Sequence, residues 1–162
     1  ISMNGKFANN IKPYLTKLGR IPLTDDQTFI NLLKTSARED NVMCKCQDDF
    51  FELYYFQPAF VWFDGFGFKE PLSLLVIYDS FIHSGSILNF LRQKFGERPP
   101  VNGGNEKIWI EEYIMARHNW LANHSNQILQ KTIYRTNCFK EQIKNNNWSL
   151  EKPVNANGTN VL

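Results

Sequence analysis

Residues 97–117 have the sequence ERPPVNGGNEKIWIEEYIMAR, and this stretch decides the fold because it predicts where a central helix begins. Asn105 is a favourable N-cap, and Glu106 lies where the positive end of the helix dipole favours an acid. The pair Gly103-Gly104 permits a tight entry turn. We therefore expect a helix from about residue 106 to about residue 122.

The apolar residues of this predicted helix form a stripe that includes one arginine. They are Ile110, Ile114 and Leu121, and Arg117 falls between them at the spacing of a single helix face. Arg117 is therefore expected to point inward.

A second predicted helix carries a residue of the opposite charge on its apolar face. Pro71 suits the first helical position, and Leu72, Leu75, Asp79 and Ile82 follow at steps of three, four and three residues. Asp79 is therefore also expected to point inward.

An inward aspartate and an inward arginine are most simply explained as an ion pair, because each buried charge costs several kcal/mol to desolvate alone. Arg98, on the loop before the glycines, is expected to complete a network with Asp79 and Arg117. The alternative is that the Arg117 stem lies along the core edge while its charged group extends to water.

Three short motifs, in order, carry a resemblance to a known family. They are the Tyr-Phe-x-Pro-Ala run at residues 55–59, the Tyr78-Asp79 segment with His83 and a glycine after it, and the Arg98, Gly103-Gly104, Arg117 series. On these motifs, from about residue 10 to residue 157, the chain resembles the family 46 chitosanases of the lysozyme superfamily. One departure is the sequence His83-Ser84-Gly85, where the family usually has His-Gly, and no role is assigned to His83.

The resemblance implies a mainly α, lysozyme-like, two-lobed helical fold with a polysaccharide cleft between the lobes. It implies that Asp79, Arg98 and Arg117 form an ionic network that supports the catalytic acid from behind. It also implies that Tyr55 lines the cleft. Phe66 and Phe68 are further cleft candidates because sugar rings stack on aromatic faces, although core packing is the favoured interpretation for both.

The catalytic residues themselves are not evident in the sequence. Inverting glycosidases need a general acid and a second carboxylate that activates water, roughly 6.5–9.5 Å apart. In the family these acids lie near the N-terminus, ahead of the region that Ile1 matches. The first acids here, Asp25 and Asp26, follow Thr24 in a pattern typical of a capping box. We therefore expect the catalytic pair upstream of Ile1, so that the N-terminal catalytic segment is missing and the chain is the C-terminal part of a glycosidase.

Composition predicts a single globular domain over residues 1–162. The 162 residues are 43% hydrophobic and 14% aromatic, enough for one core. The net charge of +2, without basic runs interleaved with aromatics, argues against a nucleic-acid partner. No stretch approaches a membrane span, and residues 1–12 lack the apolar core of a signal peptide.

The cysteines and histidines predict neither a metal nor a cofactor. Cys44-x-Cys46 has the wrong spacing for a Cys-x-x-Cys motif, and three cysteines cannot all pair within one chain. Free, partly buried thiols are the favoured interpretation. The three histidines lack a metal-binding spacing.

Periodicity and turn residues predict helices along most of the chain. After residue 145, repeated Asn with Pro153 and Gly158 predicts an irregular tail over residues 145–162. A loop is expected at 63–68, and Ile128, Ile133 and Tyr134 are expected to face inward. The predicted helices cover residues 7–18 with a kink or restart at Pro13, 25–36, 48–62 with a bend at Pro58, 71–83, 86–95, 106–122 and 125–143.

Two substrates are compatible with the resemblance. Chitosan is a polycation and favours a cleft lined with carboxylates, whereas peptidoglycan carries acidic groups and tolerates a neutral to basic cleft. The near-balanced charge favours a peptidoglycan hydrolase of the muramidase type over a chitosanase. The competing class is a non-catalytic module that binds glycan or protein.

Similar domains also occur at the C-termini of type VI secretion spike proteins, as cell-wall-degrading effectors. The resemblance therefore implies an antibacterial toxin that is secreted and acts in the periplasm of a target bacterium. It further implies a periplasmic immunity protein as a partner, because such an effector would endanger its own producer.

Overall fold

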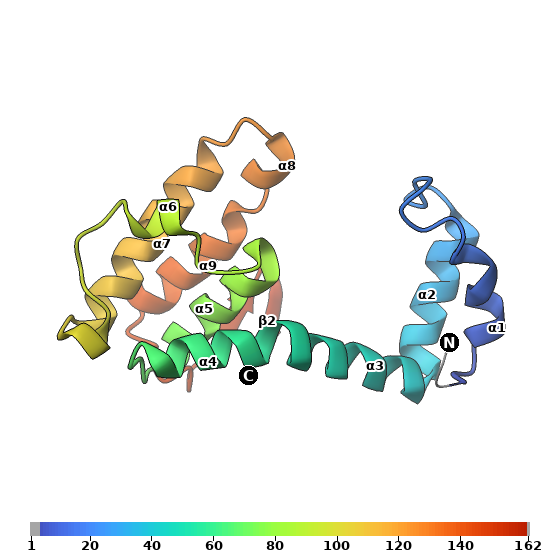
Figure 1. Cartoon of the computed structure of the whole chain (residues 1–162), viewed down its shortest axis with the longest axis horizontal. Coiled ribbons are helices and arrows are strands. Elements are labelled where there is room, and N and C mark those ends of the chain that lie inside the picture. Colours follow the sequence, from blue (N-terminus) through green and yellow to red (C-terminus); the bar gives the residue numbers. More distant parts are fainter. Residues whose placement is uncertain (1–3, 162) are drawn as a thin grey trace. The chain divides into compact units, whose positions relative to one another are not determined.

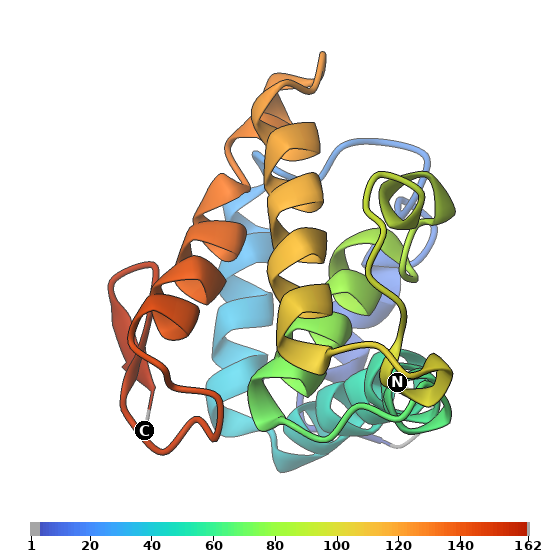
Figure 2. The same ribbon diagram turned by 90° about the vertical axis from the view of Figure 1, so that its left-hand side faces the viewer.

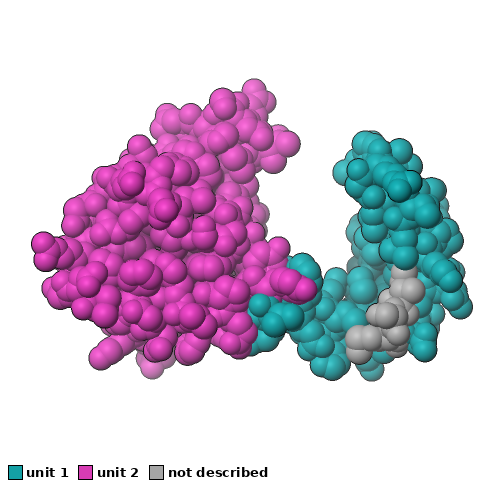
Figure 3. All heavy atoms as spheres, viewed as in Figure 1, with its two compact units in different colours: residues 1–53 teal, residues 54–162 magenta. Residues whose placement is uncertain are grey.

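The computed structural model describes residues 4–161, and most of these residues are helical, which confirms the predicted mainly α class. The chain divides into two compact units, residues 1–53 and 54–162, shown in teal and magenta in Figure 3. Each unit is described by itself.

The first unit is built from short helices joined at an aspartate. It contains α1 (Ala8–Ile11), η1 (Lys12–Tyr14), α2 (Gln27–Glu39) and α3 (Asn41–Phe51). The Asp40 side chain accepts hydrogen bonds from the backbone N–H groups of Val42 and Met43 and also from that of Phe7. One carboxylate therefore caps α3 and ties the N-terminal segment to the α2–α3 junction.

The cap of α2 differs from the expected capping box. Asp26, not Thr24, is the N-cap, and its carboxylate accepts the N–H of Phe29 at 2.9 Å. The helix therefore begins two residues later than predicted and continues to Glu39. Thr24 lies outside it because Asp26 already satisfies a free N–H of the first turn.

The predicted bend at Pro58 takes the form of a π-helical stretch. η2 (Glu52–Phe56) has π-helical hydrogen bonding and α4 (Gln57–Gly65) follows, with Pro58 in its first turn. Proline has no N–H and its ring clashes with the preceding turn of a regular helix, so a wider turn before it relieves the clash. Because α4 continues to Gly65, the loop expected from residue 63 begins only at Phe66.

The second unit packs its helices around one apolar core, with α5 (Pro71–Ser84), α7 (Glu106–Ala122) and α9 (Ile133–Lys144) in contact with one another. α4 packs against α5, as Figure 1 shows, and α7 and α9 run side by side in Figure 2. The core residues include Leu72, Ile77, Trp109 and Ile110, none of them more than 1% exposed.

The two helices expected to carry the inward charges are present with nearly the predicted bounds. α7 spans the predicted residues, and the Asn105 side chain accepts the N–H groups of Lys107 and Ile108, as its capping role requires. α5 begins at Pro71 and ends with Gly85 in the left-handed conformation.

The helix predicted at residues 86–95 is reduced to α6 (Asn89–Arg92). The Arg92 guanidinium donates to the carbonyl oxygens of Phe95 and Glu97, at 3.0 and 2.7 Å. These bonds stabilise a non-helical backbone in the residues after α6. Apolar periodicity does not predict such side-chain-to-backbone bonds, so the predicted helix was too long.

The helix predicted at residues 125–143 is divided into α8 (Gln127–Gln130) and α9. The Thr132 hydroxyl donates to the carbonyl of Leu129, a side-chain bond that competes with the helical ladder. The break changes the helical phase, so Ile128 and Tyr134 are exposed, contrary to expectation, and Thr136, Phe139 and Gln142 are the buried residues of α9.

The tail predicted to be irregular ends in a β-hairpin. β1 (Val154–Ala156) pairs antiparallel with β2 (Thr159–Val161). Asn157 and Gly158 between them both have positive φ, the conformation that two-residue hairpin turns require. The Asn-Gly pair was therefore a hairpin signal that the prediction missed.

The loop before α7 depends on a close approach at Gly104. A Cβ atom there would lie 1.7 Å from the carbonyl oxygen of Arg98, whereas at Gly96 it would meet nothing within 4 Å. Gly104 is therefore required by packing, and Gly96 is not.

We predict that Gly104→Ala lowers the free energy of unfolding by on the order of 2–3 kcal/mol, because a backbone carbonyl must move to admit the methyl group. Gly96→Ala is the matched control and should change it by less than about 1 kcal/mol. Urea denaturation of both variants measures the difference. Equal stability of the two would contradict the proposed steric role of Gly104.

Candidate functional site

The site is a buried carboxylate held by two guanidinium groups from different helices. Asp79 of α5 accepts from Nη1 of Arg117, on α7, at 2.7 Å. Its other oxygen accepts from Nε of Arg135, on α9, at 2.8 Å. The structure therefore brings Asp79 and Arg117 together as predicted and shows that both point inward.

The cluster carries more positive than negative charge and is not fully hydrogen-bonded. Arg117 is 1% exposed and Asp79 9%, and the two guanidinium charges face a single carboxylate charge. Among the described residues, Nε and Nη2 of Arg117 have no hydrogen-bond partner. Buried charged donors without partners are costly, so these two atoms retain unmet hydrogen-bonding capacity.

The Ser80 hydroxyl, on α5, contacts Arg117 and is itself held by the Tyr113 hydroxyl, on α7. The Ser80 hydroxyl accepts from Nη1 of Arg117 at 3.3 Å and donates to the carbonyl of Val76. The Tyr113 hydroxyl donates to Ser80 at 2.9 Å, and burial raises the pKa of Tyr113, so this phenol keeps its proton. Arg117 is therefore held by one neutral partner, Ser80, as well as by Asp79.

His83 lies one turn after Asp79, and the charges of the cluster affect its pKa. Burial first, and then the positive charges of Arg117 and Arg135, lower the pKa of His83, while the negative charge of Asp79 opposes them. Neutral His83 is therefore the form favoured in the folded protein.

Arg98, the third residue predicted for the network, does not take part in it. Its side chain is exposed, and the ion pairs of Asp79 among the described residues are with Arg117 and Arg135. Arg98 contributes instead through its backbone, against which Gly104 packs. The second cation comes from α9 because α9 packs against both α5 and α7.

The aromatic cleft candidates differ in burial. Phe68 is 3% exposed and packs between Trp62, Phe63 and Trp109, so its ring has no free face for a sugar, and the cleft prediction is wrong for this residue. Phe66 is half-buried, with its ring 4.3 Å from that of Trp62.

Tyr55 lies in η2 and is half-buried. Its place in a cleft, which the resemblance implies, stays a prediction.

Arg135 is the site residue that the sequence prediction missed. Treating residues 125–143 as one helix assigned the wrong inward face, because the break before Ile133 shifts the phase. A usable signal exists within α9 alone, where Arg135, Phe139 and Gln142 are spaced by four and three residues.

An apolar pocket of about 480 Å³ lies beside the cluster. Asp79 and Arg135 supply its polar wall. The other lining residues come mainly from α9 and the C-terminal hairpin and include Leu75, Phe139, Leu150, Val154 and Val161. The ionic cluster is therefore accessible from an apolar hollow rather than sealed on every side.

Residues 4–161 contain neither a metal-binding cluster nor a membrane-crossing helix. No three His, Cys, Asp or Glu side chains in this range come together in a way that could bind a metal ion. None of the helices in the same range combines the length and apolarity that a membrane-crossing helix needs. The three cysteines are partly buried, as predicted, and form no disulfide among the described residues.

We predict that Arg117→Ala lowers the free energy of unfolding by about 3–5 kcal/mol, because it leaves a buried carboxylate with one partner instead of two. Arg98→Ala is the matched control and should cost less than about 0.5 kcal/mol, since Arg98 is exposed. Thermal or urea denaturation measures both. A loss below about 1 kcal/mol for Arg117→Ala would show that the buried pair contributes little.

The lowered pKa of His83 predicts a pH dependence of stability. Protonation is disfavoured in the folded state, so the unfolded chain binds the extra proton below the ordinary pKa of 6.5, and stability falls as the pH falls through this value. His83→Gln should therefore lose less stability than the parent chain between pH 7.5 and pH 5.5. Urea denaturation at both pH values tests this, and parallel losses would contradict it.

Comparison with known proteins assigns the chain to a family. The model of Glycosyl hydrolase family 46 matches residues 3–154. A curated chitosanase of Bacillus subtilis (strain 168) is 26% identical over 166 residues, and the match covers 91% of this chain. The chain spans 60% of the length of that relative.

Solved structures show the same fold. Native chitosanase from Bacillus subtilis MY002 superposes with a TM-score of 0.79 at 24% identity, over 96% of this chain and 73% of that one. The family 46 chitosanase of Gynuella sunshinyii in complex with chitotetraose gives 0.76 at 20% identity, over 93% and 70%.

A mutant of the MY002 enzyme complexed with 6 GlcN gives 0.78 at 26% identity, over 95% and 72%. With the family model matched along residues 3–154 and the lysozyme-like fold of its solved members, this chain belongs to glycosyl hydrolase family 46.

Proposed function

We propose that this chain is part of a glycosidase that cleaves polysaccharides of amino sugars, with chitosan as the first candidate substrate. The observation that carries the proposal is the Asp79–Arg117–Arg135 cluster in a chain of family 46. Two relatives solved in complex with chitotetraose and with 6 GlcN support the choice of substrate.

The cluster is suited to hold a catalytic carboxylate in position. The unpartnered Nε and Nη2 of Arg117 are two donors on one planar group, which matches the two oxygens of a carboxylate. We propose that a general acid supplied by sequence outside this chain takes this place.

Asp79 has a definite electrostatic task in this proposal. A guanidinium beside a carboxyl group favours its ionised form and lowers its pKa, whereas a general acid must stay protonated until it reaches the glycosidic oxygen. By neutralising part of the charge of Arg117 and Arg135, Asp79 lets them orient the acid without removing its proton. Asp79 is thus a positioning residue.

The first test compares this chain with the same protein extended by its native upstream sequence. Release of reducing sugar ends is measured on chitosan and on purified peptidoglycan. We expect release only from the longer form, because two carboxylates are needed for the reaction. If neither form hydrolyses but both bind glycan, the chain is a non-catalytic binding module and the proposal fails.

In the hydrolysing form, Asp79→Asn should shift the alkaline limb of the pH–rate profile to lower pH. The two guanidinium groups would then lower the pKa of the acid, which loses its proton earlier as the pH rises. Asp64→Asn, an exposed aspartate of α4, is the control and should leave the profile unchanged. An unshifted profile in Asp79→Asn with lowered stability would leave Asp79 with a structural role only.

Peptidoglycan is the second candidate because of the charge of the chain. The net charge of +2 and pI near 8.4 do not favour a polycation such as chitosan over a glycan with acidic peptide stems. In this alternative the protein would be an antibacterial effector acting in the periplasm of a target cell, with a cognate immunity protein. Release from peptidoglycan but not from chitosan, and growth arrest on periplasmic expression, would favour it.

A further inference from the structure

A broad groove of about 1140 Å³ runs along the solvent face of α7, away from the ionic cluster. Its lining comes from α7, from the turn after α6 and from the residues after α7, and includes Glu111, Glu112, Asn119, Trp120 and Lys94. Asp79, Arg117 and Arg135 are not among the lining residues. The groove is therefore separate from the site described above.

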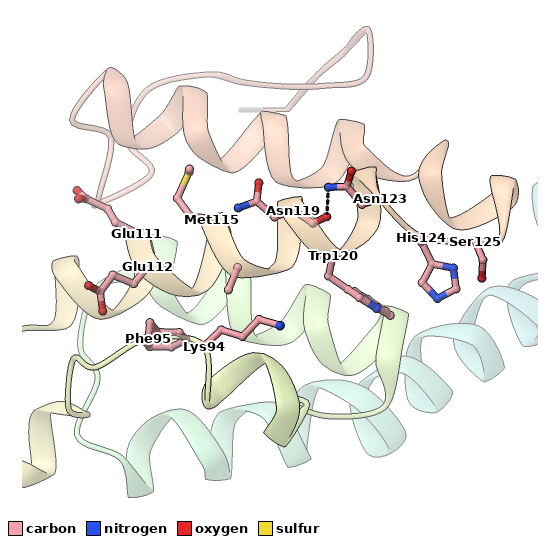
Figure 4. Close-up of a pocket in the computed structure, with 11 residues that line it drawn as sticks. Lys94, Phe95, Glu111, Glu112, Met115, Asn119, Trp120, Asn123, His124 and Ser125 are labelled. Atoms are coloured by element: carbon pink, nitrogen blue, oxygen red, sulfur yellow. Dashed lines mark hydrogen bonds between the residues drawn. The ribbon is translucent and has the colours of Figure 1, made fainter.

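The groove combines an aromatic ring with polar groups in a row. Figure 4 shows Glu111 and Glu112 toward one end, His124 and Ser125 toward the other, and Trp120 between them. From Glu111 to Trp120 the helix rises by about 13 Å, which suits a short oligosaccharide better than a single sugar. Asn119 adds an exposed amide in the same span.

The orientation of the Trp120 ring is fixed by two neighbouring rings. Phe90 and His124 each meet it in an edge contact, with ring centroids 5.5 and 5.3 Å away. The ring is half-buried and packs against the core on one side. A rigid, partly exposed aromatic ring is a surface on which the apolar face of a sugar can stack.

The charges of the groove favour a cationic ligand. Glu111 and Glu112 supply two carboxylates against the single ammonium group of Lys94. The Glu112 carboxylate is positioned by the N–H of Glu97, at 3.1 Å from one of its oxygens. Protonated amino groups of a glucosamine polymer match such a pair, with hydroxyl groups left for the amide of Asn119.

We propose that the groove along α7 is a second binding site for amino-sugar oligosaccharides, which holds a polymer to the protein outside the catalytic cleft. The choice of ligand rests on the proposed function. The groove binds sugar by stacking on Trp120 and by ion pairs with Glu111 and Glu112. It has no part in bond cleavage.

The test is a titration of the present chain with a glucosamine hexamer at low salt, followed by nuclear magnetic resonance. The indole N–H signal of Trp120 should shift and saturate, and the fully N-acetylated hexamer should bind more weakly because it lacks the charges. In the double variant Glu111→Gln, Glu112→Gln, the hexamer concentration that half-saturates the shift of the Trp120 signal should rise roughly fivefold, as expected for the loss of two exposed ion pairs.

The control is the double variant Glu141→Gln, Glu151→Gln, which removes two exposed carboxylates that do not line the groove. It should bind as the parent does. Trp120→Phe, which keeps an aromatic ring in the packed position, should bind with intermediate strength. A Trp120 signal that does not move, or that moves equally in both double variants, would overturn the proposal.

A second measurement separates this inference from the proposed function. In a hydrolysing longer form, the groove variant should lose activity on polymeric chitosan while cleaving a soluble tetramer at the parent rate. Loss on both substrates, or on neither, would contradict a separate polymer-binding site. If no form hydrolyses chitosan, the proposed function fails, and the titration still decides whether the groove binds the hexamer.

Discussion

The buried carboxylate of Asp79 is the constraint on which the second unit depends, because a charge removed from water must be matched by a counter-charge nearby. Asp79 meets Arg117 and Arg135, which come from helices 38 and 56 residues further along the chain. One carboxylate therefore links α5, α7 and α9 at a defined depth. The apolar core sets how closely these helices pack, and the ion pairs set which parts of them face one another.

The composition of the cluster is not the one that stability alone would favour. A buried ion pair is often no more stabilising than apolar residues of similar volume, and here the cluster carries an excess positive charge with two unpartnered donors on Arg117. Ser80 holds Arg117, and Tyr113 holds Ser80, without adding charge. The cluster is thus fixed in position while two donors of Arg117 keep unmet hydrogen-bonding capacity.

Predicting the site from sequence succeeded where periodicity was uninterrupted. Asp79 and Arg117 each lie on a regular helix that begins at a clear signal, Pro71 or Asn105, so the inward face followed from the spacing. Arg98 was expected from its place before the glycines and from the family resemblance, neither of which fixes where its side chain points. Arg135 was missed because residues 125–143 were taken as one helix, whereas α8 and α9 are separate. Phe68 could not be assigned to core or cleft from its residue type, since an aromatic ring suits both.

The sequence by itself determined the helical class, the bounds of α5 and α7 and the inward direction of two opposite charges, because these depend on residues within a few turns of one another. Only the tertiary structure decided that Arg135 is the second partner of Asp79, that Phe68 is buried and that a groove follows α7. Each of these depends on which helices meet. Which helices meet depends on packing between segments far apart in the chain, and local sequence patterns do not predict that packing.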